Sequence, residues 1–160
     1  DPEVILFDEP TTGLDPHVRQ DFWALVLELK KEGKAILLTT HYMDEASRLC
    51  DRLILLQKGE IVGEGAPKEI VSEVIGDEVV EIIGPSHEGI SQALGDTDIW
   101  IANFSDGYLI ALPRGDADLI LERLLQLPHK QYTRRASNLD DVFIRLTGGK
   151  LTGLRQDFVL

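Results

Sequence analysis

Cysteine and long apolar runs are both scarce in this sequence. The one cysteine, Cys50, can form no internal disulfide, and it lies in an apolar helical pattern where we expect a buried, unreactive thiol. The longest apolar runs, such as residues 4–7 and 35–38, are far shorter than the roughly 20 residues that a membrane-spanning helix needs. The first residues also lack the basic and then apolar stretches of a signal peptide. These absences predict a cytoplasmic chain that does not itself cross a membrane.

Basic residues are also in short supply. Lys and Arg number 16 against 28 Asp and Glu, which gives a formal net charge of -12. General affinity for nucleic acid needs clustered positive charge, so this balance argues against such a partner. With 43% hydrophobic and 28% charged residues, the composition is that of a globular protein. We therefore expect a folded chain with no nucleic-acid partner.

The first half of the chain alternates short apolar strands with amphipathic helices. Residues 4–7 form a wholly apolar run, as in a parallel strand that is covered on both faces. A helix is predicted from Pro16, with Asp15 as its N-cap and Gly33 after its end. A second buried strand follows at residues 35–39. This order predicts an α/β unit with a right-handed crossover.

Further elements complete this half and continue into a second one. We expect a helix at 44–50, a hairpin of 52–57 and 60–63 that turns at Lys58-Gly59, and a helix at 67–74. In the second half the expected elements are strand 78–83, helix 87–94, strand 98–104, strand 108–112, helix 116–126, strand 131–135 and helix 139–146. The βαββαβ order, with a hairpin turn at Asp106-Gly107, predicts a ferredoxin-like sandwich.

The predicted domain boundary is at residue 76, where the second βα pattern starts. It divides the chain into residues 1–75, residues 76–147 and a glycine-containing tail, 148–160.

Two adjacent carboxylates, Asp8 and Glu9, directly follow the first apolar strand. Ligands of open α/β sheets bind beyond the carboxyl ends of the strands, which is where these side chains are expected. Neighbouring strand residues point in different directions, so one carboxylate can support Mg²⁺ while the other polarises an attacking water. By itself the pattern also fits a buried strand followed by a solvated acidic turn.

The residues that follow these carboxylates form recognisable motifs. The loop runs Thr11-Thr12-Gly13-Leu14-Asp15, and Thr39-Thr40-His41 comes one helix and one strand later. In order and spacing this resembles the ATP-binding cassette (ABC) family: a Walker B strand ending in Asp8-Glu9, a D-loop ending in Asp15 and a switch histidine, His41.

The resemblance implies ATP and Mg²⁺ as cofactors and a role for each motif residue. Asp8 is expected to support Mg²⁺, Glu9 to act as general base and His41 to contact the γ-phosphate. Asp15 is expected to communicate across a dimer that sandwiches the nucleotide. Plainer structural explanations also exist: Asp15 is a good helix N-cap, and a histidine at the end of a buried strand can simply hydrogen-bond the backbone.

Other motifs of the family are missing from the sequence. It contains no G-x-x-x-x-G-K-S/T phosphate loop, no Leu-Ser-Gly-Gly signature and no glutamine loop. The chain therefore looks like a piece of a longer protein. Because a phosphate loop supplies most of the groups that bind the phosphates, we expect this chain alone to be inactive as an ATPase.

The segment 134–148 resembles the C-terminal extension of exporter ATPases that work with separate ABC-2 type permeases. It contains the run Leu139-Asp140-Asp141-Val142-Phe143, which also reads as an amphipathic helix capped by Asn138. The resemblance implies the C-terminal part of a P-loop NTPase (ABC) domain followed by a small α+β ferredoxin-like domain. It also implies an ABC-2 permease and a second ATP-binding subunit, identical or different, as partners. The protein is then expected in the cytoplasm, peripheral on the inner face of the cell membrane.

Two other functions fit parts of the same pattern. One is a non-transport cassette ATPase that acts on nucleic acid or ribosomes, although such proteins often carry coiled coils or basic insertions, and this sequence has neither. The other is a regulatory or dimerising module formed by residues 77–147.

Overall fold

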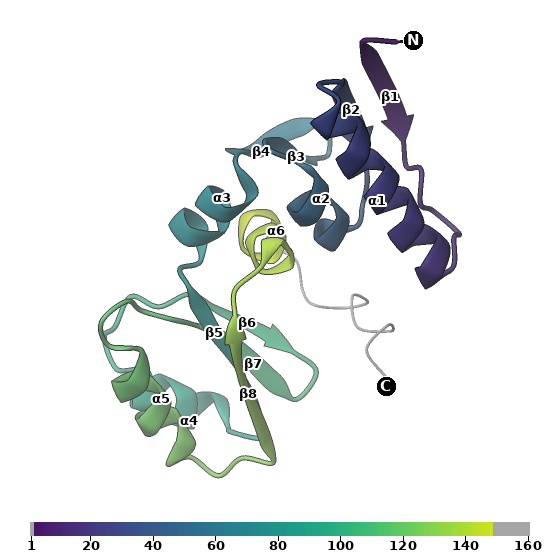
Figure 1. Ribbon diagram of the computed structural model, residues 1–160. Coiled ribbons are helices and arrows are strands. Elements are labelled where there is room, and N and C mark those ends of the chain that lie inside the picture. Colours follow the sequence, from purple (N-terminus) through teal and green to yellow (C-terminus); the bar gives the residue numbers. More distant parts are fainter. Residues whose placement is uncertain (1, 149–160) are drawn as a thin grey trace. The chain divides into compact units, whose positions relative to one another are not determined.

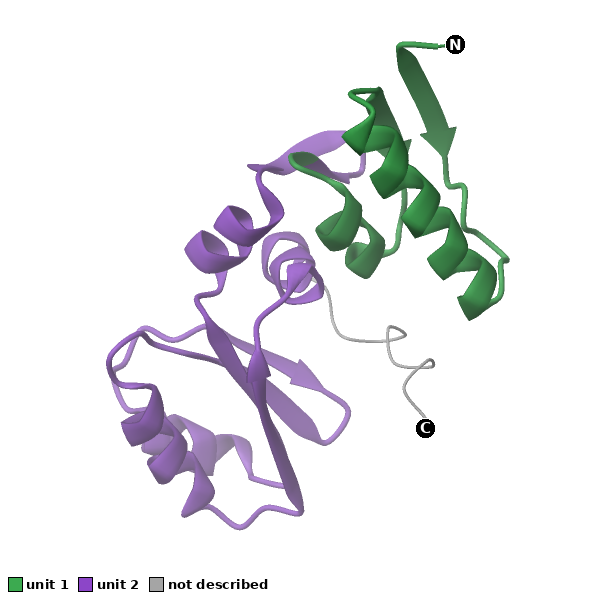
Figure 2. Cartoon of the chain, in the orientation of Figure 1, with its two compact units in different colours: residues 1–53 green, residues 54–160 purple. Residues whose placement is uncertain are grey.

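A computed structural model describes residues 2–148 and divides the chain into two compact units, 1–53 and 54–160 (Figures 1 and 2). Each unit is described by itself. The predicted domain boundary at residue 76 falls inside the second unit, where α3 (Pro67–Val74) and β4 (Glu60–Gly65) contact α6 (Leu139–Thr147). The division into functional domains stays a prediction.

The first unit has the predicted strand, helix and strand. It contains β1 (Val4–Asp8), α1 (Pro16–Lys31), β2 (Ala35–Thr39) and the short helix α2 (Met43–Leu49). The strands β1 and β2 are parallel, and Asp8 lies opposite Thr39. Helix α1 begins as expected, because a carboxylate oxygen of Asp15 accepts hydrogen bonds from the backbone N–H groups of His17 and Val18. The predicted α/β unit is confirmed.

The small core of this unit lies between α1, α2 and one face of the two strands. Its buried residues are Trp23, Val26 and Leu49, and partly buried apolar side chains of both strands pack against them. The opposite strand face is exposed, including Val4, Leu6 and Leu37. The expectation that β1 is covered on both faces is therefore wrong for this structure. Alternate residues of β1 and β2 point to opposite faces, and α1 and α2 supply packing for only one of them.

Cys50 is half-buried at the end of α2 rather than fully buried. Burial raises the pKa of its thiol, which favours the protonated, unreactive form.

The second unit begins with the predicted hairpin. Strands β3 (Leu53–Gln57) and β4 turn at Lys58 and Gly59, both of which have positive φ angles as a tight hairpin turn requires. Helix α6 then returns to this region. A side-chain carbon of Leu146 would lie 3.2 Å from a Cβ added at Gly63, so α6 approaches β4 closely at a glycine.

The remainder of the unit is a four-stranded sheet with two helices. Its elements are β5 (Glu78–Ile83), α4 (His87–Leu94), β6 (Ile101–Phe104), β7 (Gly107–Leu112), α5 (Ala117–Leu125) and β8 (Gln131–Ala136). The strand order is β6-β7-β5-β8, and every neighbouring pair is antiparallel. This topology confirms the predicted ferredoxin-like arrangement.

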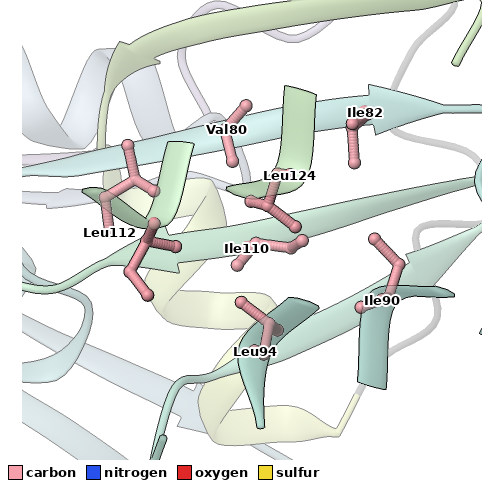
Figure 3. Close-up of a cluster of buried hydrophobic side chains, with 8 residues drawn as sticks. Val80, Ile82, Ile90, Leu94, Ile110, Leu112 and Leu124 are labelled. Atoms are coloured by element: carbon pink, nitrogen blue, oxygen red, sulfur yellow. The ribbon is translucent and has the colours of Figure 1, made fainter. Parts of the chain in front are cut away.

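Helices α4 and α5 cover one face of that sheet (Figure 1). Between the two helices and the sheet lies a core of eight buried apolar residues, most of them labelled in Figure 3: Val80, Ile82, Ile90, Leu94, Ile110, Leu112, Ile120 and Leu124. This core is larger than that of the first unit.

The hairpin between β6 and β7 differs by one residue from the prediction. Phe104 pairs with Gly107, so the turn residues are Ser105 and Asp106, and Ser105 takes the positive φ angle. Gly107 belongs to β7 because it pairs with Phe104, and it is a glycine because a Cβ there would lie 2.9 Å from the carbonyl oxygen of Ile82. Its glycine serves close packing rather than the turn.

Ion pairs join the sheet to α6. Arg135 of β8 donates to Glu81 at 2.9 Å and forms two hydrogen bonds of 2.7 and 2.8 Å with Asp141 of α6. Asp141 is almost fully buried and also completes a capping box with Asn138. Within residues 2–148, no helix is long and apolar enough to cross a membrane.

Candidate functional site

The carboxyl ends of β1 and β2 meet at Asp8, Glu9 and Thr39. The Thr39 hydroxyl donates a hydrogen bond to Oδ1 of Asp8. The backbone N–H of Glu9 donates to the Thr39 carbonyl oxygen at 3.0 Å and to its hydroxyl oxygen at 3.1 Å. One threonine therefore fixes both candidate carboxylate residues at the end of the parallel strand pair.

Glu9 adopts an unusual backbone conformation. Its φ angle is 43°, in the left-handed region that residues other than glycine seldom occupy. Such strain costs on the order of 1–3 kcal/mol and is frequent at functional sites. The conformation turns the chain sharply after Asp8 and starts the loop that leads to α1.

This turn brings Glu9 next to His41. Oε2 of Glu9 lies 3.3 Å from Nδ1 of His41 and accepts a hydrogen bond of 3.2 Å from the Thr12 hydroxyl. Both Glu9 and His41 are about half exposed, so solvent and a ligand can reach them. The structure thus brings together the predicted general base and the predicted phosphate-contacting histidine, which lie 32 residues apart in sequence.

Asp15 lies apart from this pair. Its carboxylate caps α1, and among the described residues it forms no hydrogen bond or ion pair with Asp8, Glu9 or His41. Its expected role across a dimer therefore stays a prediction, while its role as an N-cap is confirmed.

Asp8 is the candidate ligand for a metal ion. Among residues 2–148, no group of three or more His, Cys, Asp or Glu side chains could hold a metal ion by itself. Mg²⁺ commonly binds through one or two carboxylates together with water and substrate phosphates. A single carboxylate at a strand end therefore fits a cation that arrives with a nucleotide better than a structural metal.

A buried polar cluster of Thr11, Trp23 and Glu45 lies beside the site and was not predicted from the sequence. Oε1 of Glu45 accepts hydrogen bonds from the Thr11 hydroxyl at 2.9 Å and from the indole N–H of Trp23 at 2.8 Å. Trp23, a buried residue of the small core, is therefore also a hydrogen-bond donor. No sequence signal marked Glu45, because a glutamate near the start of a helix is ordinarily solvated.

The curated proteins that this chain resembles are named as ATP-binding proteins of exporters. Over 151 residues the chain is 40% identical to the Nod factor export ATP-binding protein I of Rhizobium etli, covering 94% of this chain and 47% of that protein. Over 155 residues it is 41% identical to the protein of the same name from Paraburkholderia xenovorans, covering 94% and 49%. These relatives, at about 40% identity over 94% of the chain, are ABC ATP-binding proteins. The chain spans about half the length of the curated relatives it matches.

Two solved structures also resemble part of the chain. One is an ATP-binding subunit of an ABC transporter, with 33% identity, a TM-score of 0.41 and coverage of 45% of this chain and 30% of the other. The second is an ATP-binding cassette of an ABC transporter in an ADP conformation, with 34% identity, a TM-score of 0.41 and coverage of 46% and 29%. No family model matches the chain.

Proposed function

We propose that this chain is part of the nucleotide-binding subunit of an exporter, which couples ATP binding and hydrolysis to transport through a separate membrane permease. The observation that carries the proposal is the pairing of Glu9 with His41 beside Asp8, at the carboxyl ends of two parallel strands. The relatives' names, which specify export and ATP binding, support the same function.

Each residue of the site has a proposed task in hydrolysis. Mg²⁺ bound with the nucleotide would neutralise charge on its phosphate oxygens. Asp8 is the residue that would support the ion, and the Thr39 hydroxyl orients its carboxylate. Glu9 polarises the attacking water as general base, and His41 contacts the γ-phosphate. Their 3.3 Å separation allows both side chains to face one water and one phosphate group.

The proposed partners are an ABC-2 type permease and a second ATP-binding subunit. ATP binding would close the pair of ATP-binding subunits, with Asp15 near their contact, and hydrolysis would reopen it. The protein would then lie on the inner face of the cell membrane through its permease. The acidic charge of -12 favours this function over a cassette ATPase that acts on nucleic acid.

The function is tested in the full-length protein that contains this chain. Glu9→Gln removes the base while keeping the size of the side chain, and the Mg²⁺-dependent ATPase rate should fall about 100-fold or more. His41→Ala should lower it by a comparable factor through lost phosphate contact. The matched controls are Glu28→Gln and His87→Ala, which change an exposed glutamate and an exposed histidine elsewhere. Equal rates for Glu9→Gln and Glu28→Gln would contradict the proposal.

The chain of 160 residues alone is proposed to be inactive, because its sequence contains no phosphate loop. Titration with a fluorescent ATP analogue should show no saturable binding at micromolar concentrations. Magnesium-dependent phosphate release by this chain alone would refute the proposed inactivity without affecting the assignment of Glu9.

A further inference from the structure

Glu45 is a fully buried carboxylate, with an exposed fraction of 0%. It lies in the first turn of α2, four residues after His41. Both hydrogen bonds that it accepts from side chains reach Oε1, while Oε2 is buried without a hydrogen-bond partner among the described residues. Burying a carboxylate is costly, and an unpaired buried oxygen adds to the cost. A helix that needed only packing at this position would be better served by an apolar residue.

The two donors to Glu45 come from different segments. Thr11 lies in the loop that follows Glu9, and its side chain is buried. This loop is further tied by backbone hydrogen bonds from Thr12 to the Glu9 carbonyl and from Leu14 to the Thr11 carbonyl. Trp23, in contrast, lies in the middle of α1 and belongs to the core. Glu45, itself in α2, therefore connects the loop of residues 9–14, which begins at the proposed base Glu9, to α2 and to the core.

This connection bears on the strained turn at Glu9. A residue with φ of 43° holds that conformation only where its surroundings fix it. The loop after Glu9 is fixed to α2 through Thr11 and Glu45, and α2 follows directly from the segment that carries His41. The separation of Glu9 and His41 thus depends on a contact that neither residue makes.

We propose that Glu45 is a positioning residue that, through Thr11, holds the loop of residues 9–14 against α2 and so keeps Glu9 and His41 in place for hydrolysis. The inference rests on the proposed function of these two residues. Glu45 acts through Thr11 and does not itself touch nucleotide. Its hydrogen bond with Trp23 stabilises the fold of the first unit instead, because Trp23 lies in α1 and outside the loop of residues 9–14.

The two hydrogen bonds to the same oxygen provide a matched pair of variants. In the full-length protein, Thr11→Val and Trp23→Phe each delete one buried donor to Oε1 of Glu45. Valine nearly matches the shape of threonine, and phenylalanine keeps an aromatic ring but is smaller than tryptophan. Thr11→Val should lower kcat about 10- to 100-fold with little change in KM, because it loosens the catalytic geometry rather than nucleotide binding. Both variants should lower the melting temperature by similar amounts, because each loses one buried hydrogen bond. Trp23→Phe, however, should leave kcat near the parental value. Thr11→Ser, which retains the hydroxyl, should restore most of the rate.

A second measurement does not require ATPase activity. The ring resonances of His41, followed by NMR with labelled histidine, should shift in Thr11→Val and stay in place in Trp23→Phe and Thr11→Ser. Equal kcat values and unchanged His41 resonances in Thr11→Val and Trp23→Phe would overturn the positioning role. A parental protein without Mg²⁺-dependent ATPase activity would overturn the proposed function instead. In that case, a selective shift of the His41 resonances would still support the positioning role of Glu45.

Discussion

The two units of the chain differ in how completely their apolar side chains are packed. In the first unit three residues form the buried core, and the strand face that includes Val4, Leu6 and Leu37 is exposed. In the ferredoxin-like part of the second unit, eight residues form a core between the sheet and two helices. The strained Glu9 and its contact with His41 occur in the less packed unit. The candidate site therefore lies at exposed strand ends, while the stability of the chain should come mainly from the antiparallel sheet.

The largest effect is expected from breaking the ion pairs of Arg135. Arg135→Ala removes the guanidinium that bonds Glu81 and Asp141, and Asp141 is only 1% exposed. Removing one partner of a buried pair costs about 3–5 kcal/mol in the free energy of unfolding. Urea denaturation can follow this unit separately in a Trp23→Phe background, where Trp100 is the single tryptophan and lies in the second unit.

The neighbouring arginine is a matched control. Arg134 also bonds two carboxylates, but Asp118 is exposed and the Glu78 side chain is 38% exposed. Exposed ion pairs contribute about 0–1 kcal/mol, so Arg134→Ala should have a much smaller effect. If both substitutions changed the midpoint equally, burial of Asp141 would not explain the role of Arg135.

A smaller effect is expected from testing the packing difference itself. Leu124 is fully buried between α5 and the sheet and faces the labelled core residues in Figure 3. Leu124→Ala should lower the free energy of unfolding by about 2–5 kcal/mol. Leu6→Ala is the same substitution in the other unit, at a residue of β1 that is 71% exposed. It should lower the free energy of unfolding by no more than about 0.5 kcal/mol. Comparable losses in urea denaturation would show that the exposed face of β1 is packed in solution.

The same contrast explains which features could be predicted from sequence. Apolar periodicity and capping residues predicted the elements well, since Asp15 and Asn138 cap α1 and α6 as expected. The one-residue error at Ser105 arose because a glycine beside an aspartate signals a turn. The close approach of Phe104 and Ile82 that requires Gly107 is a tertiary contact.

The candidate site, too, could be predicted only as far as local sequence patterns reach. Asp8 and Glu9 could be found because they stand at the end of an apolar strand, and His41 because the motifs together resemble the ABC family. All three lie at or near the carboxyl ends of parallel strands, which meet. The contact between Glu45 and Thr11 could not be found, because it joins positions 34 residues apart and buries a carboxylate that sequence statistics place in solvent. Charged residues that are buried by tertiary structure leave no local pattern.

The smallest effect is expected at an exposed ion pair of the well-packed unit. Asp77 accepts two hydrogen bonds of 2.8 Å from Arg114, and these bonds lower the pKa of its carboxyl below the ordinary 3.8. Because the folded state binds the proton less tightly than the unfolded state, the pair stabilises the fold above pH 3.8, and this stabilisation is lost as the pH falls through the lowered pKa. Asp77→Asn should thus lower the urea midpoint slightly at neutral pH, and the difference from the parental chain should vanish in acid. About 1 M salt should also remove most of it, because charges this exposed are screened. A difference that persisted in both acid and salt would mean that Asp77 acts through its shape and neutral hydrogen bonds, as the buried contacts of this unit do, and not through its charge.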